Sequence, residues 1–209
     1  MTHHDKTLIE QLAGVIEGSP IDRAFRARDE ARRNAEVSYQ LLLHPKNPDP
    51  VSLIERRAVA LFVAALHEEP QTLGYFTTLL RETEGVEEGL VSLVQRDAEQ
   101  SARPGPYGRF PEGPLSVEDL DGPAYEASGP LRNAAGVRLT AALEHAHLLV
   151  LHPRDASPVQ LEALVLAGWS TAGIVVLSQL VAFLSFQIRV VAGLRTAVLT
   201  RQPHAELVG

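Results

Sequence analysis

The 209-residue chain contains no cysteine. This absence excludes disulfides, thiolate metal sites, iron–sulfur clusters and every form of cysteine-based catalysis. The chain also has no tract of basic residues, and its formal net charge is −7. It therefore offers no positive field to a phosphate backbone, and we expect no nucleic-acid partner.

Long hydrophobic runs are scarce as well. The most apolar segment, 172–186, is interrupted by Ser178 and Gln179. A bilayer span needs about 20 mostly apolar residues, so this segment predicts a buried core helix and no membrane partner. The segment 1–20 has early polar residues and no sustained apolar core, unlike an export signal. We expect a cytoplasmic protein.

Helical patterns fill most of the chain. Hydrophobic residues make up 45% and charged residues 22%, which is ordinary for a globular protein. No segment shows strand alternation bounded by turn signals, so the predicted class is all-α. We expect helices at about 6–17, 21–43, 52–67, from 70 through the segment TLGYFTTLL, and at about 86–101, 131–152, 158–167 and 170–199.

A proline- and glycine-rich segment separates two helical halves. Residues 103–115 hold four prolines and three glycines, which is typical of a loop. We predict one all-α domain, 1–209, with an N-terminal half at 1–102, a connection at 103–130 and a C-terminal half at 131–209.

The segment AVALFVAAL, 58–66, is apolar on all sides and predicts a central helix. Ser52 and Glu55 form the reciprocal capping pattern at its start. The polar segment HEEPQT, 67–72, interrupts the apolar sequence directly afterwards. It predicts a turn between two helices, with Pro70 in the first turn of the second one.

Two segments resemble the carboxymuconolactone decarboxylase and alkylhydroperoxidase D-like superfamily. The segment 55–76, ERRAVALFVAALHEEPQTLGYF, is similar to its acid-led helix, break and redox motif. The segment 155–194 is similar to the end of the peroxidase-related branch, through Phe186, Arg189, Gly193 and Leu194. The resemblance implies an alkylhydroperoxidase D-like helical bundle that forms homo-oligomers.

The redox motif of that superfamily is replaced in this chain. The resemblance places Glu69 and Thr72 where the Cys-x-x-Cys cysteines are expected, and Tyr75 where a histidine is expected. Arg57 stands where a proton-relay glutamate is usual, with Glu55 two residues away. Peroxide reduction needs a nucleophilic thiolate and a resolving thiol, so this chain is not a thiol peroxidase.

The same junction carries the first candidate site. His67, Glu69 and Tyr75 are candidate catalytic residues, with Glu69 as the base or acid, because a desolvated carboxylate has a raised pKa. The alternative is that these side chains, with Glu68, cap helix ends in contact with water.

Histidines give the second candidate. His145 and His147 are about 200° apart on a helix, so they do not face one ion, and we predict no metal and no cofactor. His145, alone or with His67, is a candidate for lining a pocket; the alternative is a packed or surface histidine. At the N-terminus, His3, His4 and Asp5 suggest incidental metal capture at most.

The last helix carries a small and polar face with one cation. Its members, spaced by three or four residues, are Ser178, Ala182, Ser185, Arg189, Gly193 and Thr196. We predict that Arg189 and Ser185 bind an anionic ligand. A buried Arg189 needs a partner, and Glu55, Glu69 or that ligand can supply it; the alternative is a purely structural ion pair.

Two functions remain open. The first is a cysteine-free relative that binds a small molecule, or performs acid–base chemistry, in a small polar pocket. The alternative is a non-catalytic structural or interaction subunit that pairs with a related peroxidase-like protein. A cavity bordered by Glu69 and Arg189 favours the first, and a large exposed apolar patch favours the second.

Overall fold

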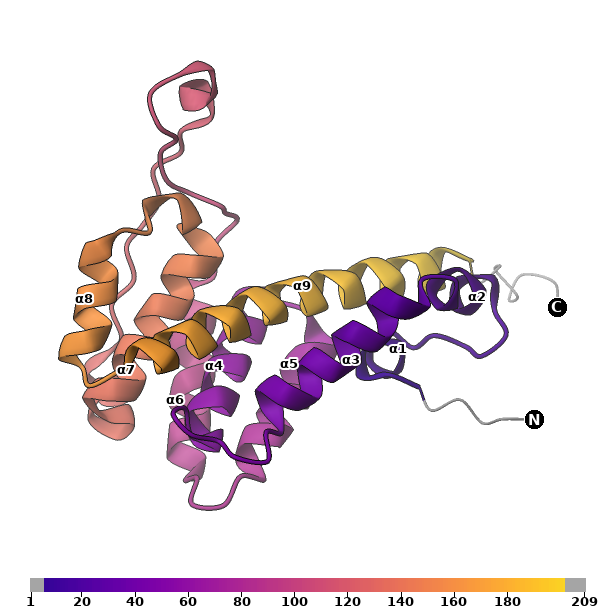
Figure 1. The fold of residues 1–209 in the computed structure, drawn as a ribbon, viewed down its shortest axis with the longest axis horizontal. Helices are drawn as coiled ribbons and strands as arrows, with labels where there is room; N and C mark the ends of the chain where they lie inside the picture. The colour runs from indigo at the N-terminus through magenta and orange to yellow at the C-terminus, as the bar shows by residue number, and fades with distance from the viewer. Residues whose placement is uncertain (1–5, 202–209) are drawn as a thin grey trace, which may run out of the picture.

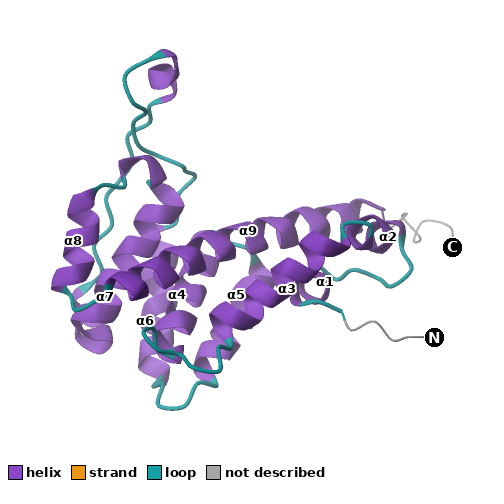
Figure 2. Cartoon of the chain, viewed as in Figure 1, coloured by secondary structure: helices purple, strands orange, loops and turns teal. Residues whose placement is uncertain are grey.

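The computed structural model describes residues 6–201, and their regular secondary structure is entirely helical (Figures 1 and 2). The predicted all-α class is confirmed. His3, His4 and Asp5 lie outside the described residues. The α-helices are α1 (Leu8–Leu12), α2 (Pro20–Arg26), α3 (Asp29–Leu43), α4 (Leu53–Leu66), α5 (Pro70–Arg81), α6 (Glu88–Ser101), α7 (Gly129–Leu151), α8 (Pro158–Leu166) and α9 (Thr171–Arg201).

Helix α4 is the centre of the fold. Every residue from Ala58 to Leu66 is buried, and helices α5, α6, α7 and α9 all pack against it. The predicted capping box is present, because Ser52 and Glu55 exchange hydrogen bonds at the start of the helix. One core cluster contains Leu61 of α4, Leu143 of α7 and Leu184 of α9. The two helical halves therefore share one hydrophobic core.

The expected single helix at about 21–43 is wrong. The chain turns at Ala27 and Arg28, which separates α2 from α3. The turn lets Ile21 of α2 join a small apolar cluster with Val15 and with Val191 of α9. Burial of these side chains outweighs the local helix preference of the charged sequence. The first helix is also shorter than expected, because the chain leaves it before Gly14, which has a φ of 66°.

A buried carboxylate attaches the N-terminal helices to α3. Glu10 of α1 is fully buried, and its Oε2 accepts hydrogen bonds from Arg32 at 2.9 Å and from the Thr7 backbone at 2.7 Å. Arg26 of α2 lies 3.7 Å from the same carboxylate. Burial alone would raise the pKa of Glu10, but the hydrogen bonds from Arg32 and Thr7 outweigh it and lower that pKa.

The connection between the halves projects from the body as an arm (Figure 1). Gly108 and Leu120 form an isolated antiparallel bridge at its base, and one short 3₁₀ helix, Pro114–Glu118, lies at its tip. Beyond the arm, α7 is kinked at Gly136, which has a φ of 70°. This kink is not predictable from the helical pattern, because an isolated glycine is tolerated within a helix.

We predict that Glu10→Gln lowers the free energy of unfolding at pH 7 by about 1 to 3 kcal/mol, because charge-assisted hydrogen bonds are lost. The folded-state pKa of Glu10 is depressed, so its contribution is present above the unfolded pKa of about 4.3 and is lost as the pH falls through the folded value. Urea unfolding at pH 7 and pH 3 measures both effects. A difference from wild type that does not shrink in acid would contradict this assignment.

Candidate functional site

Helix α9 forms one wall of an open groove of about 730 Å³. The C-terminal end of α7 also lines the groove, through Leu149 and Val150, and so do Pro106 and Pro153. The groove side of α9 carries Ser178, Ser185 and Arg189. The prediction that these three residues share one face is confirmed. Their placement follows from spacings of seven and four residues on a helix whose other side is buried in the core.

Each serine of the groove is hydrogen bonded to a histidine from another helix. Ser185 Oγ lies 3.2 Å from His67 Nε2, and Ser178 Oγ lies 3.3 Å from His145 Nε2. His67 is the residue that ends α4, and His145 comes from the middle of α7. The structure therefore brings the two predicted histidines to the same face of α9, one behind each hydroxyl.

Both imidazoles are neutral at pH 7. Burial lowers the pKa of His67 to about 4, and the positive charge of Arg189 contributes to that shift. Burial also lowers the pKa of His145. Among residues 6–201, no carboxylate is hydrogen bonded to either ring. Neither serine–histidine pair thus has the third group that orients a catalytic base, and the arrangement is better suited to binding than to nucleophilic catalysis.

Arg189 is exposed on the groove and has no ion-pair partner within the described part of the chain. The expected ion pair with Glu55 or Glu69 is not formed, because both carboxylates are taken by other arginines. Glu55 lies 2.5 Å from Arg138, and Glu69 lies 3.1 Å from Arg195. The premise of a buried Arg189 is also incorrect, and its charge is available to a ligand in the groove.

Glu69 and Tyr75 lie apart from the groove. Glu69 is buried and caps α5, since its Oε2 accepts from the Thr72 backbone at 2.7 Å while its Oε1 pairs with Arg195. The Tyr75 hydroxyl is hydrogen bonded to Tyr39. Tyr75 lines a separate surface hollow with Tyr39 and His44. The structure therefore does not bring His67, Glu69 and Tyr75 together, and their catalytic role stays a prediction.

The chain between His67 and Pro70 makes the predicted turn. Glu68 has a φ of 53°, an uncommon left-handed conformation for a residue other than glycine. This residue reverses the chain direction, so that Glu69 caps α5 and Pro70 begins it. The tight turn is what leaves His67 at the end of α4, facing Ser185.

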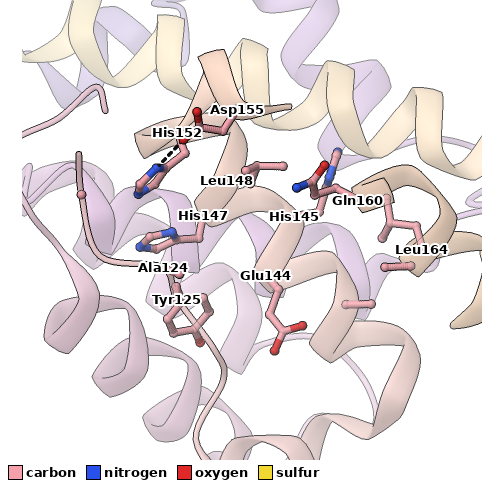
Figure 3. A pocket seen from close by; sticks show the side chains of 13 residues that line it. Ala124, Tyr125, Glu144, His145, His147, Leu148, His152, Asp155, Gln160 and Leu164 are labelled. Carbon is pink, nitrogen blue, oxygen red and sulfur yellow. Dashed lines mark hydrogen bonds and ion pairs between the residues drawn. The ribbon is translucent and has the colours of Figure 1, made fainter. Parts of the chain in front are cut away.

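A second cavity of about 400 Å³ lies between α7, α8 and the segment 122–125 (Figure 3). His147 stacks on Tyr125 and on His152, with ring centroids 4.8 and 6.1 Å apart. Glu144 does not join them, because its Oε1 accepts from Arg132 and from the Ala127 backbone, each at 3.1 Å. Tyr125 and His152 were not predicted from the sequence, because they are distant from each other along the chain and belong to no motif.

Most polar side chains that line this second cavity are hydrogen bonded to other groups of the protein. His152 has an acceptor at each ring nitrogen, Asp155 Oδ2 and the Pro123 carbonyl, both at 3.0 Å. Burial lowers the pKa of His147 to about 4. His145 Nδ1 has no hydrogen-bond partner. No group of three or more metal-ligating side chains is present among residues 6–201.

Comparison of the chain with protein-family models, with curated proteins and with solved structures finds no match.

We predict that stability falls between pH 6.5 and pH 4 partly because His67 resists protonation. Its folded pKa of about 4 lies below the unfolded value of about 6.5. The contribution is complete above pH 6.5 and is lost by up to about 1.4 kcal/mol per pH unit as the pH falls towards 4. His67→Gln should give a shallower dependence in urea unfolding across this window. An unchanged slope would show that His67 is not held neutral.

Proposed function

We propose that this protein is a cysteine-free relative of the carboxymuconolactone decarboxylase and alkylhydroperoxidase D-like superfamily. It binds a small molecule with an anionic group in the groove between α7 and α9. The observation that carries the proposal is Arg189, a cation on the groove with no ion-pair partner among residues 6–201.

The surroundings of Arg189 support an anionic ligand. Ser185 is one helical turn away, and Ser178 is two turns further along the same face of α9. A hydroxyl both donates and accepts hydrogen bonds. The guanidinium presents planar donors that match a carboxylate or phosphate. A groove of about 730 Å³ falls in the range of small-molecule sites, about 300–1,000 Å³.

The histidines behind the serines set the polarity of the site. Because His67 and His145 are neutral at pH 7, Arg189 supplies the positive charge of this part of the groove. Protonation of His67 would put a second positive charge beside Arg189, which is one reason why its pKa is low. We therefore assign binding, rather than acid–base catalysis, as the function of the groove.

We do not propose thiol peroxidase activity for this protein. The chain has no cysteine, and the position that the resemblance assigns to a redox cysteine holds Glu69, which caps α5. A carboxylate neither attacks a peroxide oxygen as a thiolate does nor forms a disulfide with a resolving group.

An exposed apolar surface favours the second candidate, a structural or interaction subunit. Helix α8 has one buried residue, Leu164, although most of its residues are apolar. Its exposed side chains include Val159, Val165 and Leu166, which are 70%, 55% and 82% accessible. Apolar surface of this kind marks sites of protein contact. This second candidate needs no ligand at Arg189.

We predict that small carboxylates stabilise the wild-type protein and that Arg189→Ala removes the effect. A thermal-shift series with acetate, succinate, benzoate and γ-butyrolactone tests this. At ten times its Kd a ligand contributes about 1.4 kcal/mol, or about 3 to 6 °C for a chain of this size. Arg33→Ala is the matched control, because Arg33 is an exposed arginine on α3 that pairs with Asp29.

The shift should persist in Arg33→Ala and disappear in Arg189→Ala, and the uncharged lactone should give the smallest shift. If no compound stabilises the wild type more than Arg189→Ala, the groove is not an anion site. That result would leave the interaction subunit as the better interpretation.

A further inference from the structure

The outer side of α9 carries an exposed stripe without acidic residues. Its members follow spacings of four, three, four, three and four residues and are all exposed. They are Val175, Gln179, Ala182, Phe186, Arg189 and Gly193. We call this set the outer stripe. Ala172 and Thr196 extend it by one step at either end.

This composition is unusual for a helix face in contact with water. A surface helix normally presents charged and polar residues outwards, but the outer stripe has a single charged member. Phe186 and Val175 are 50% and 52% accessible. Helix α9 is apolar enough to cross a membrane by length and composition, and only 39% of its most apolar window is buried. The outer stripe belongs to the part of α9 that is not buried, together with half-buried residues on either side of it.

The alternating spacings are those of a coiled-coil seam. An apolar repeat of three and four residues averages 3.5 per turn, which keeps the seam of a helix facing a partner helix. From Ala172 to Thr196 the seam is about 36 Å long. The half-buried residues Val176, Phe183 and Val190 flank it on one side and widen the apolar strip.

The stripe is complementary to itself when two copies run antiparallel about a two-fold axis that crosses the stripe midway between Ala182 and Phe186. Phe186 then lies opposite Ala182 of the partner subunit, and Val175 lies opposite Gly193 of the partner subunit. Each large side chain faces a small one, and the symmetry repeats every pair. Gln179 lies opposite Arg189 of the partner subunit, where its amide oxygen can accept from the guanidinium.

A parallel arrangement loses this complementarity. It would place Arg189 against Arg189 of the partner subunit, and like charges at such short range repel. It would also place two phenylalanines together and leave a gap between two glycines. In the antiparallel register each Arg189 lies five residues from the two-fold axis, about 7.5 Å along the helix, so the two arginines are about 15 Å apart in that direction.

We propose that two copies of this chain form an antiparallel dimer through the outer stripes of their α9 helices. Ala182, Phe186 and Arg189 also line the groove of the proposed function. The partner helix therefore covers the open edge of that groove and brings its Gln179 to Arg189. This last consequence rests on the proposed function, whereas the dimer itself does not.

Light scattering after size-exclusion chromatography tests the interface. The wild type should be a dimer at micromolar concentration. Ala182→Glu should be monomeric, because it places two carboxylates against the phenylalanines nearest the axis. Val37→Glu is the control, since Val37 is a 54% accessible valine on α3 outside the stripe, and it should stay dimeric. A monomeric wild type, or a dimeric Ala182→Glu, would overturn the proposal.

Single cysteines test the register, because the chain has none of its own. Val175 and Gly193 are 18 positions apart, about 27 Å along a helix. A mixture of Val175→Cys and Gly193→Cys should cross-link on oxidation, whereas either variant alone should not. A Cβ at Gly193 meets nothing within 4 Å, so the substitution fits the folded monomer.

Cross-linking of Val175→Cys alone would indicate a parallel pair and would overturn the register. The alternative occupant of the outer stripe is a lipid surface. Co-sedimentation of a monomeric wild type with phosphatidylcholine vesicles would therefore overturn the dimer. These outcomes are independent of the carboxylate series. Loss of ligand stabilisation in a protein that remains a cross-linkable dimer would remove only the proposed function.

Discussion

The constraint on which this fold depends is the complete burial of α4 from Ala58 to Leu66. A helix that is apolar on every side has no face for water, so α5, α6, α7 and α9 must surround it. Polar residues are therefore confined to the ends of this buried segment. His67 stands at its C-terminal end, directly before the chain reverses at Glu68. A polar imidazole is thereby fixed between the core and α9, where Ser185 meets it.

Helix α9 links the core to the two surfaces proposed as functional. Leu177, Leu184 and Ile188 are buried against the central helices, whereas the opposite side carries the outer stripe. The serines lie at the boundary between these two sides, so each can meet a buried histidine and still line the groove. The groove and the proposed dimer are consequences of one arrangement of α9, in which one side is buried in the core and the outer side has a single charged residue, Arg189.

The sequence predicted those features that depend on interactions between residues close together along the chain. The capping box at Ser52, the central helix and the shared face of Ser178, Ser185 and Arg189 follow from periodicity and capping rules. The break at Arg28 was not predictable, because it depends on burying Ile21 against residues that are distant in sequence. The ion-pair partners were also not predictable. Glu69 pairs with Arg195 and not with Arg189, and this choice depends on distances in the folded protein that residue spacing does not give.

The central claim is that Arg189 holds an anion beside a neutral His67. Arg189 contributes to the low pKa of His67, so a bound carboxylate that offsets its charge must raise that pKa. NMR titration of the His67 ring, with and without the carboxylate that stabilises the protein most, measures this directly. We predict a His67 pKa of about 4 without ligand and a higher value with it. A His67 titration that the saturating ligand leaves unchanged would contradict the claim.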